Sequence, residues 1–474
     1  MGKEEKGKVV RAGIGYTVGN YMLKGLSFIT VPIFSRLLST SDYGIFNAYL
    51  AYQSIAFLLV GMALHTSLKN AKYRYENDFG RYNSCCILMM LLNLAAWVVI
   101  GNLIYPLYAD TIGFSRLIVN LLLIDSFGTA LIQFYNVYVG IDYKYGDFLK
   151  LSAFNAVGNL VCSVVLILTV FRDRRAEGRI IGNVIPVFLI AVFIILSFWR
   201  KQKPRFKAEY AGFALRYSLP LIPHGISQVI LAQFDRLMIK GMIGESESGI
   251  YSFAYNIFSI INVTSNSLDN VWGPWFYERM EEKDYDAIRR QSAKYAFGMM
   301  LFSVMVMLAT PELVMILGTP AYHDAMYSVI PIVIGGYFVF LYSLPASVEY
   351  YHAKTGFIAM GTAAAAAVNV ILNYFFIQKY GYIAAAYTTL ITYFLYFIFH
   401  YILAWRIQKA VLFHTGKIFF DIVFILITGI VSLMLTEYWL VRWGLIIVVG
   451  IYGIFWLDKE FDVRQKIREK AGRS

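Results

Sequence analysis

The feature that most constrains this sequence is a series of fourteen apolar segments, each about 20 residues or longer, separated by short polar connections. A run of this length is what a helix needs to cross the hydrocarbon core of a bilayer. Within that core only helices and closed barrels satisfy their own backbone groups. We therefore predict an all-α polytopic membrane protein. The segments are 12–38, 43–68, 83–105, 115–139, 147–171, 179–199, 214–241, 249–272, 294–316, 326–349, 356–377, 382–405, 417–436 and 439–457.

Composition agrees with this prediction. The 474 residues are 58% hydrophobic and 15% charged, whereas soluble domains are nearer 45–50% apolar and about 25% charged. Of the 42 Lys and Arg residues, 31 fall in one set of connections and 8 in the other. The richer set is expected on the cytoplasmic side, which places both termini there. The eight outside cations are Arg36, Arg116, Arg172, Arg174, Arg175, Arg179, Lys379 and Arg442.

The outside sequence "RDRRAEGR" (172–179) breaks the positive-inside pattern. Either it is functional, or the fifth and sixth segments are misplaced. The formal net charge of +12 does not indicate nucleic acid, because the cations lie in short connections rather than on one soluble face. No connection exceeds about 25 residues, and no phosphate-binding glycine motif is present. We expect no enzyme activity, no cofactor and no metal.

An internal repeat divides the chain. "SDYGIFNAY" (41–49) follows the first segment, "SESGIYSFAY" (246–255) follows the seventh, and Gly44 and Gly249 are 205 residues apart. Both follow segments that run outward, so the halves have parallel topology, and cargo is expected near the midplane between them. The predicted domains are an N-terminal lobe (1–205), a C-terminal lobe (206–410), two further helices (411–457) and a basic tail (458–474).

Charged residues inside apolar segments indicate a polar cavity. A charge at the bilayer centre costs roughly 2.5–3.5 kcal/mol, so it usually faces a cavity or a partner. The alternatives are helix packing for the amides and extension of the Lys and Arg side chains to the surface. The candidates for substrate binding are Lys24, Arg236, Lys240, Asn20, Gln228, Asn256 and Asn266.

Acidic groups and histidines in the segments are candidates for coupling to an ion. Asp125 is either a coupling site or the counter-ion of Lys24, and Glu349 is expected near an inside helix end, in contact with water. Pro220 and Pro223 remove backbone donors and predict a break at the start of the seventh segment. The candidates for ion coupling are Asp125, Asp235, His224 and Glu349.

Two stretches carry a family resemblance: "GYTVGNYMLKGLSFITVPIFSRLLSTSDYGIF" (15–46) and "YSLPLIPHGISQVILAQFDRLMIKGMIGESESGIYSFAY" (217–255), the second followed by "NVWGPWFYERM". The chain resembles the polysaccharide (Wzx-type) flippases of the multidrug/oligosaccharidyl-lipid/polysaccharide exporter superfamily. The resemblance implies two six-helix lobes plus two helices, in the bacterial cytoplasmic membrane, that open alternately to either face. The family motif carries over to Asp235 and Arg236 within "FDRLMI", and Lys24 matches only loosely.

The implied cargo is an oligosaccharide on undecaprenyl diphosphate, moved with a proton or sodium gradient and without metal or nucleotide. Membrane lipids and polysaccharide polymerase or assembly proteins are the implied partners. A multidrug or cation antiporter of the same superfamily, a membrane-embedded glycosyltransferase or polymerase, and a scaffold stay as alternatives. The sequence leaves the sugar composition open, and O-antigen, capsule and exopolysaccharide are equally compatible with it.

Overall fold

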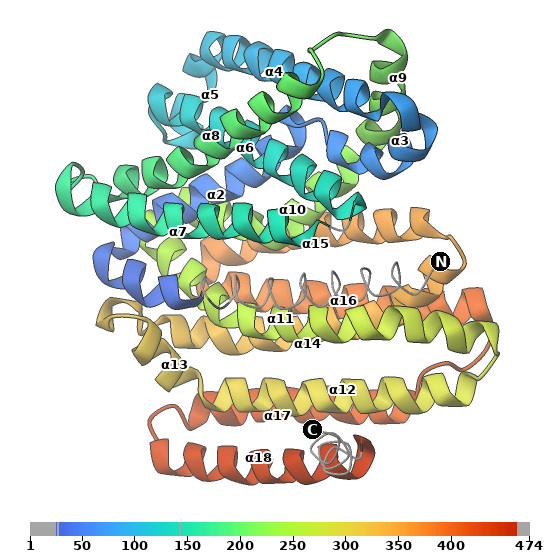
Figure 1. Cartoon of the computed structure of the whole chain (residues 1–474). Helices are drawn as coiled ribbons and strands as arrows, with labels where there is room; N and C mark the ends of the chain where they lie inside the picture. The colour runs from blue at the N-terminus through green and yellow to red at the C-terminus, as the bar shows by residue number, and fades with distance from the viewer. Residues whose placement is uncertain (1–24, 26–27, 143, 462–474) are drawn as a thin grey trace, which may run out of the picture. The chain divides into compact units, whose positions relative to one another are not determined.

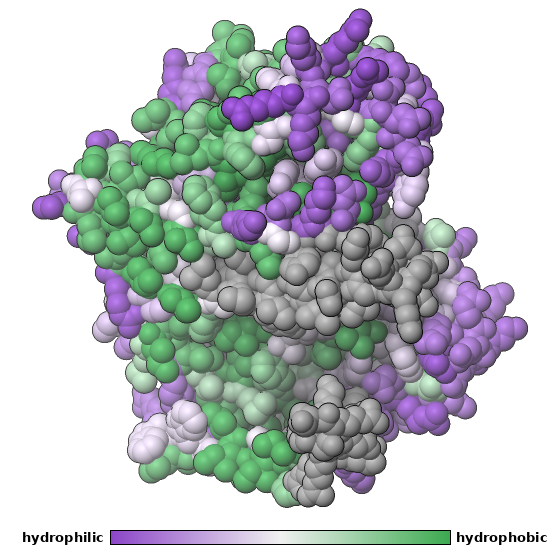
Figure 2. All heavy atoms as spheres, in the orientation of Figure 1, coloured by the Kyte–Doolittle hydropathy of each residue, from purple (hydrophilic) through white to green (hydrophobic). Residues whose placement is uncertain are grey.

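The computed structural model describes residues 25, 28–142 and 144–461, and in this part the chain is almost wholly helical (Figure 1). The all-α prediction is confirmed. The chain forms two compact units, Met1–Gly249 and Ile250–Ser474. Asn20 and Lys24 lie outside the described residues. The face drawn in Figure 2 carries apolar side chains over the middle of the helices and hydrophilic side chains at their ends, as expected for membrane-crossing helices.

The described residues of the first unit form five long apolar helices and several shorter elements. In it α2 packs against α6 and α10, and α7 packs against α8. Its helices are α2 (Thr40–Val60), α3 (Leu68–Arg74), α4 (Phe79–Leu103), α5 (Tyr105–Ile112), α6 (Arg116–Ile141), α7 (Tyr145–Thr169), α8 (Arg175–Lys201), α9 (Ala208–Ser218) and α10 (Ile222–Met242), with 3-10 turns at Leu64–Ser67, Glu76–Asp78 and Leu219–Leu221.

The second unit is organised around α14, which is the most deeply buried of its long helices. α14 packs against α16, α12 and α17, and α18 packs on α12. The helices are α11 (Glu245–Glu281), α12 (Tyr285–Leu308), α13 (Thr310–Leu317), α14 (Ala325–Tyr351), α15 (Thr355–Tyr380), α16 (Ile383–Gln408), α17 (Thr415–Met434) and α18 (Trp439–Phe461), with a 3-10 turn at Pro320–Tyr322.

Eleven helices of the described part are long and apolar enough to cross a membrane. Segments 417–436 and 439–457 form separate helices, α17 and α18, as predicted. The first predicted segment lies largely outside the described residues, which show a shorter apolar helix, Phe28–Leu37. The other difference from fourteen concerns α10 and α11, which are not among the eleven. These two helices carry most of the polar residues singled out in the second half of the sequence.

Local sequence accounts for where key helices begin. Ser39 caps α2 through a reciprocal pair of hydrogen bonds with Asp42, which satisfies backbone donors at the helix start. Pro220 lies in a 3-10 turn that separates α9 from α10, and Pro223 lies in the first turn of α10. The predicted break at these prolines is confirmed.

The starts of α2 and α11 occupy equivalent positions in the two copies of the internal repeat. Gly44 is the fifth residue of α2 and Gly249 the fifth residue of α11, so the same offset relates both glycines and both helix starts. The first turns of the two helices cross here. Thr40 and Ser246 share a hydrogen bond of 2.7 Å between their hydroxyls. The compact units divide at Gly249, so α9 and α10 belong to the first unit; a lobe boundary at residue 205 stays a prediction.

Arg442, in the first turn of α18, is buried with 2% of its surface exposed. Its guanidinium donates to both carboxylate oxygens of Glu312, at 2.5 and 2.7 Å, and to the carbonyl oxygens of Leu308 and Leu435. Arg442, one of the eight cations predicted for the outside, is therefore a buried residue and not a surface one. A bidentate pair of this kind fixes geometry as well as charge, and it ties α18 to α12 and α13.

This ion pair predicts a pH dependence of stability. Burial raises the pKa of Glu312, but the hydrogen bonds that its carboxylate accepts, first among them those from Arg442, together with the charge of Arg442 outweigh burial, and the pKa lies below its ordinary value. Such a carboxyl stabilises the fold above its unfolded-state pKa, and this contribution is lost as the pH falls through the folded-state pKa. We expect the unfolding temperature in detergent to fall more steeply between about pH 5 and 3 for wild type than for Glu312→Gln. Equal slopes for the two proteins would contradict this.

Candidate functional site

The charged end of α10 lies in the first unit. Asp235 is buried, with 1% exposed, and one carboxylate oxygen accepts the backbone N–H of Arg236 at 2.8 Å. Arg236 is half-buried, and its carbonyl accepts the hydroxyl of Ser248 at 3.0 Å. The ammonium of Lys240 lies 3.6 Å from a carboxylate oxygen of Glu245 and 4.4 Å from the ring centroid of Phe114. Lys240 therefore has both a counter-ion and an aromatic neighbour.

The remaining α10 candidates lie closer to the helix start. His224 is half-buried in the first turn, and Gln228 one turn later is exposed. Further along, Gln233 donates to the hydroxyl of Ser54 on α2 at 3.3 Å. Of the three candidates His224, Gln228 and Asp235, only Asp235 is buried.

A row of exposed polar side chains runs along α11, which has 37 residues and is about 55 Å long. At 100° per residue the members of the row fall within about 80° of the helix circumference. Asn266 donates to Asn262 at 2.6 Å, and Asn256, on a neighbouring half-buried position, donates to the backbone carbonyl of Phe253 at 3.1 Å. The exposed members are Ser259, Asn262, Asn266 and Asn270.

A buried chain of hydrogen bonds leads from Arg179 on α8 to Asp125 on α6. The guanidinium donates to the amide oxygen of Asn159 at 2.6 Å, and the amide of Asn159 donates to that of Asn183. Asn183 donates to a carboxylate oxygen of Asp125 at 2.9 Å, and Tyr49 donates to the same oxygen at 3.0 Å. Every donor points from the cation toward the carboxylate, so the bonds polarise one another in one direction.

Arg179 is the last residue of "RDRRAEGR" and the first residue of the sixth predicted segment. It lies in the second turn of α8, is 9% exposed, and its guanidinium lies between the rings of Phe34 and Phe46, 3.9 and 4.2 Å from their centroids. The remainder of the cluster, Arg172 to Arg175, is exposed. The fifth and sixth segments are helices α7 and α8, close to the predicted ranges.

Glu349 is fully buried in the second unit, so the expected contact with water is wrong. Its carboxylate is hydrogen-bonded to Nδ1 of His400 on α16, and Tyr342, Tyr396 and Phe399 have rings within 5.5 Å of the imidazole. In the described part of the chain the other carboxylate oxygen and Nε2 of His400 have no hydrogen-bond partner. The misplacement arises because α14 continues to Tyr351, and α16 covers its end.

A second polar cluster in this unit was not singled out from the sequence. Asn369 and Asn373, one turn apart on α15, bond to each other at 3.0 Å, and Thr388 and Thr389 on α16 complete the cluster. The sequence "AAVNVILNY" does contain a recognisable indication, because two asparagines four residues apart share a helix face. Within the described residues, no three His, Cys, Asp or Glu side chains form a candidate metal site.

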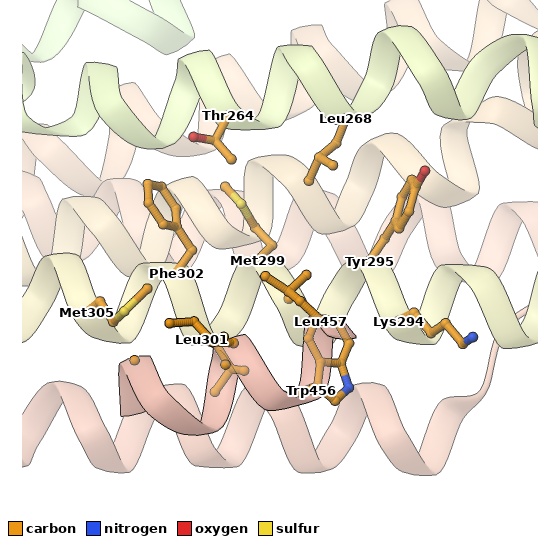
Figure 3. Close-up of a pocket in the computed structure, with 14 residues that line it drawn as sticks. Thr264, Leu268, Lys294, Tyr295, Met299, Leu301, Phe302, Met305, Trp456 and Leu457 are labelled. Carbon is orange, nitrogen blue, oxygen red and sulfur yellow. The ribbon is translucent and has the colours of Figure 1, made fainter. Parts of the chain in front are cut away.

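The second unit also holds an apolar cavity of about 610 Å³ between α11, α12 and α18 (Figure 3). Met299, Phe302 and Met305 line it from α12, and Trp456 and Leu457 line it from α18. Lys294 lies at one end of this row of side chains. Because α18 is the least buried of the candidate spans, the cavity lies beside a helix surface suited to lipid.

The family is decided by comparison with known proteins. A family model described as "Polysaccharide biosynthesis protein" matches residues 9–280, more than half of the chain. The chain belongs to this family. One relative of this polysaccharide biosynthesis protein is "Lsg locus putative protein 1" of Haemophilus influenzae, which is 24% identical over 364 residues, covering 72% of this chain and 83% of the relative.

Solved structures show that the fold is a known transporter fold. The lipid II flippase MurJ in its inward closed conformation matches this polysaccharide biosynthesis protein with a TM-score of 0.74 and 16% identity, covering 94% of this chain and 99% of that one. An inward-facing multidrug resistance MATE family transporter of the MOP superfamily matches with a TM-score of 0.62 and 15% identity, covering 82% and 96%. The predicted resemblance to polysaccharide flippases of this superfamily is confirmed.

Proposed function

We propose that this protein carries an oligosaccharide unit on undecaprenyl diphosphate from the cytoplasmic to the outer leaflet of the bacterial cytoplasmic membrane by alternating access. Both termini are then cytoplasmic. Its family is one of polysaccharide biosynthesis, and its fold resembles that of a flippase for lipid II. These two likenesses together support a lipid-linked cargo more than a free drug or cation. The protein needs no catalytic residue or cofactor for this task, only a path and a driving gradient.

The observation that carries the proposal is the exposed polar row on α11. Hydrocarbon cannot satisfy exposed amides, so polar backbone and side-chain groups at membrane depth face protein or water. Asn262, Asn266 and Asn270 offer amide donors and acceptors along one face of a helix long enough to cross a bilayer. Such a face fits a chain of sugar hydroxyls, which exchange hydrogen bonds with each carboxamide in turn.

The two ends of the cargo need different surroundings. The diphosphate requires counter-charge in a low-dielectric slab about 30 Å thick, and Arg236 and Lys240 on α10 supply cations, joined in our proposal by Lys24. The isoprenoid tail is apolar and stays in the surrounding lipid. Oligosaccharide polymerase or assembly proteins would then receive the product at the outer face.

Coupling to a proton or sodium gradient is assigned to the buried acids. Asp125 and Glu349 are both fully buried. In the described residues each has one carboxylate oxygen bound to protein donors and the other without a hydrogen-bond partner. A carboxyl group in this setting can take up a proton at its second oxygen. Asp235 and His224 stay as further candidates on α10.

Arg236→Ala and Lys24→Ala are expected to abolish surface polysaccharide, with at least a tenfold loss, because the charged headgroup loses its counter-charge. Lipid-linked oligosaccharide should then accumulate on the inner leaflet while the variants insert at normal levels. The measurement is polysaccharide immunoblotting, together with mass spectrometry of extracted lipids, in a deletion strain. Arg200→Ala, an exposed cation at the end of α8, is the matched control. Full complementation by both variants would defeat the proposal, as would loss of polysaccharide without accumulated lipid-linked material.

A further inference from the structure

A second cavity, of about 620 Å³, lies where the starts of α12 and α17 meet the end of α18. Each helix presents one stripe of residues to it, at spacings of three or four residues that keep side chains on one face. The stripes place charged groups near the helix ends and aromatic rings further in. They are Arg290, Lys294 and Phe297 on α12, Lys417, Phe420 and Asp421 on α17, and Tyr452, Trp456 and Glu460 on α18.

The cations at the mouth of this cavity differ in their partners. Lys294 is paired with Glu460 at 2.8 Å, so its charge is matched within the protein. Arg290, in the second turn of α12, and Lys417, in the first turn of α17, are both exposed, and the positive end of the α17 dipole adds to the field of Lys417. Arg290 and Lys417 therefore give the mouth of the cavity a positive charge.

The floor of the same cavity has the opposite sign. Asp421 is 2% exposed, and in the described part of the chain its Oδ2 has no hydrogen-bond partner. Leaving a buried carboxylate oxygen without a donor is unfavourable, more so than for a neutral group. Asp421 lies four residues from Lys417 along α17, a rise of about 6 Å. The cavity therefore offers cations and an unsatisfied carboxylate about one helical turn apart.

We propose that this cavity binds the headgroup of a zwitterionic aminophospholipid, phosphatidylethanolamine. The phosphate contacts Arg290 and Lys417, and the primary ammonium donates to the carboxylate of Asp421. The two-carbon linker of ethanolamine matches the one-turn separation of the two charges. The acyl chains lie along Trp456 and the lipid-exposed surface of α18. This site adjoins the apolar cavity of Figure 3, with which it shares Lys294 and Trp456, and it does not depend on the proposal for the cargo.

The phosphate and the primary ammonium of phosphatidylethanolamine distinguish it from other phospholipids at this site. Phosphatidylcholine has the same phosphate, but its quaternary ammonium has no N–H to donate to Asp421. Phosphatidylglycerol has the phosphate and no cation, so it gains nothing from Asp421. A site made only of surface cations would instead prefer the lipid with net negative charge.

Full-length protein purified in detergent tests this by native mass spectrometry with equimolar phosphatidylethanolamine, phosphatidylcholine and phosphatidylglycerol. Wild type should retain phosphatidylethanolamine about tenfold over phosphatidylcholine, the order of one charge-assisted hydrogen bond. Asp421→Asn should bring that ratio near one and leave phosphatidylglycerol binding intact, which also shows that the variant is folded. Arg290→Ala with Lys417→Ala should reduce the binding of both phosphatidylethanolamine and phosphatidylglycerol severalfold.

Two control variants remove similar charges elsewhere on exposed positions: Asp110→Asn, and Lys69→Ala with Arg81→Ala. Both should retain the wild-type lipid ratio. Equal retention of phosphatidylethanolamine and phosphatidylcholine by wild type would overturn the proposal. So would a preference that survives Asp421→Asn, or a control variant that loses as much binding as the cavity variants.

Discussion

Replacing Gly249 by alanine is expected to lower the unfolding temperature of the purified protein, whereas Gly273→Ala on the same helix is expected to leave it unchanged or raise it. A Cβ at Gly249 would lie 1.9 Å from the carbonyl oxygen of Thr40, which is backbone and cannot move aside alone. Overpacking of this kind costs about 1–3 kcal/mol. A Cβ at Gly273 meets nothing within 4 Å, and alanine there gains about 0.5–1 kcal/mol in helix propensity.

Thermal unfolding in detergent measures both changes, and surface polysaccharide in a deletion strain measures their effect on function. Gly44→Ala should behave like Gly249→Ala, because its Cβ would lie 1.9 Å from the carbonyl oxygen of Glu245. If transport requires the first turns of α2 and α11 to separate and meet again, both variants lose output while Gly273→Ala keeps it. Indistinguishable unfolding temperatures for Gly249→Ala and Gly273→Ala would show that the crossing is not close-packed in the folded protein.

The second large effect is expected for Arg179→Met. This change removes the cation from the chain of amides and leaves the carboxylate of Asp125 buried without its distant counter-charge. The loss arises from the hydrogen bonds of Arg179 to Asn159 and Ser163, because leaving a buried acceptor unsatisfied costs about 1–3 kcal/mol. Arg174→Met is the control, because Arg174 is exposed and its pair with Glu177 at 3.3 Å lies at the surface, where such pairs contribute about 0–1 kcal/mol.

A double-mutant cycle tests whether the amides couple the two charges. Asp125→Asn with Arg179→Met should be less destabilised than the sum of the single changes, with a coupling of about 0.5–3 kcal/mol. Denaturant unfolding of the four proteins gives this value directly. If the losses in the free energy of unfolding are additive, Arg179 and Asp125 act independently, and Asn159 and Asn183 do not couple the two charges.

Much of the fold was accessible from the sequence because apolar segment length is set by bilayer thickness. That argument predicted the separate helices α17 and α18 across a short polar break, and the prolines at 220 and 223 predicted the start of α10. The repeat also located two equivalent helix starts through a single shared glycine. Each of these features is local, or depends on a spacing within one stretch of chain.

The sites were harder to predict because they depend on pairs distant in sequence. Arg179 and Arg442 lie near predicted helix ends, where exposure is the ordinary expectation. Both are nevertheless buried, and their charged groups bind Asn159 and Glu312, which are distant in sequence. His400 was not singled out as the partner of Glu349, since no periodicity relates residues 51 positions apart on different helices. Apolar patterning defines which residues can enter a membrane, and it does not say which polar residues will meet there.

The crossing of α2 and α11 has a consequence for how these transporters diversify. Its nearest atoms belong to the main chain, which every sequence shares, so the fit there does not depend on any side chain that recognises sugars. If the polar row on α11 contacts the cargo as we propose, mutations there can change cargo preference without disturbing the crossing. Relatives that handle different polysaccharides would then share the same main-chain crossing and differ in the side chains around it.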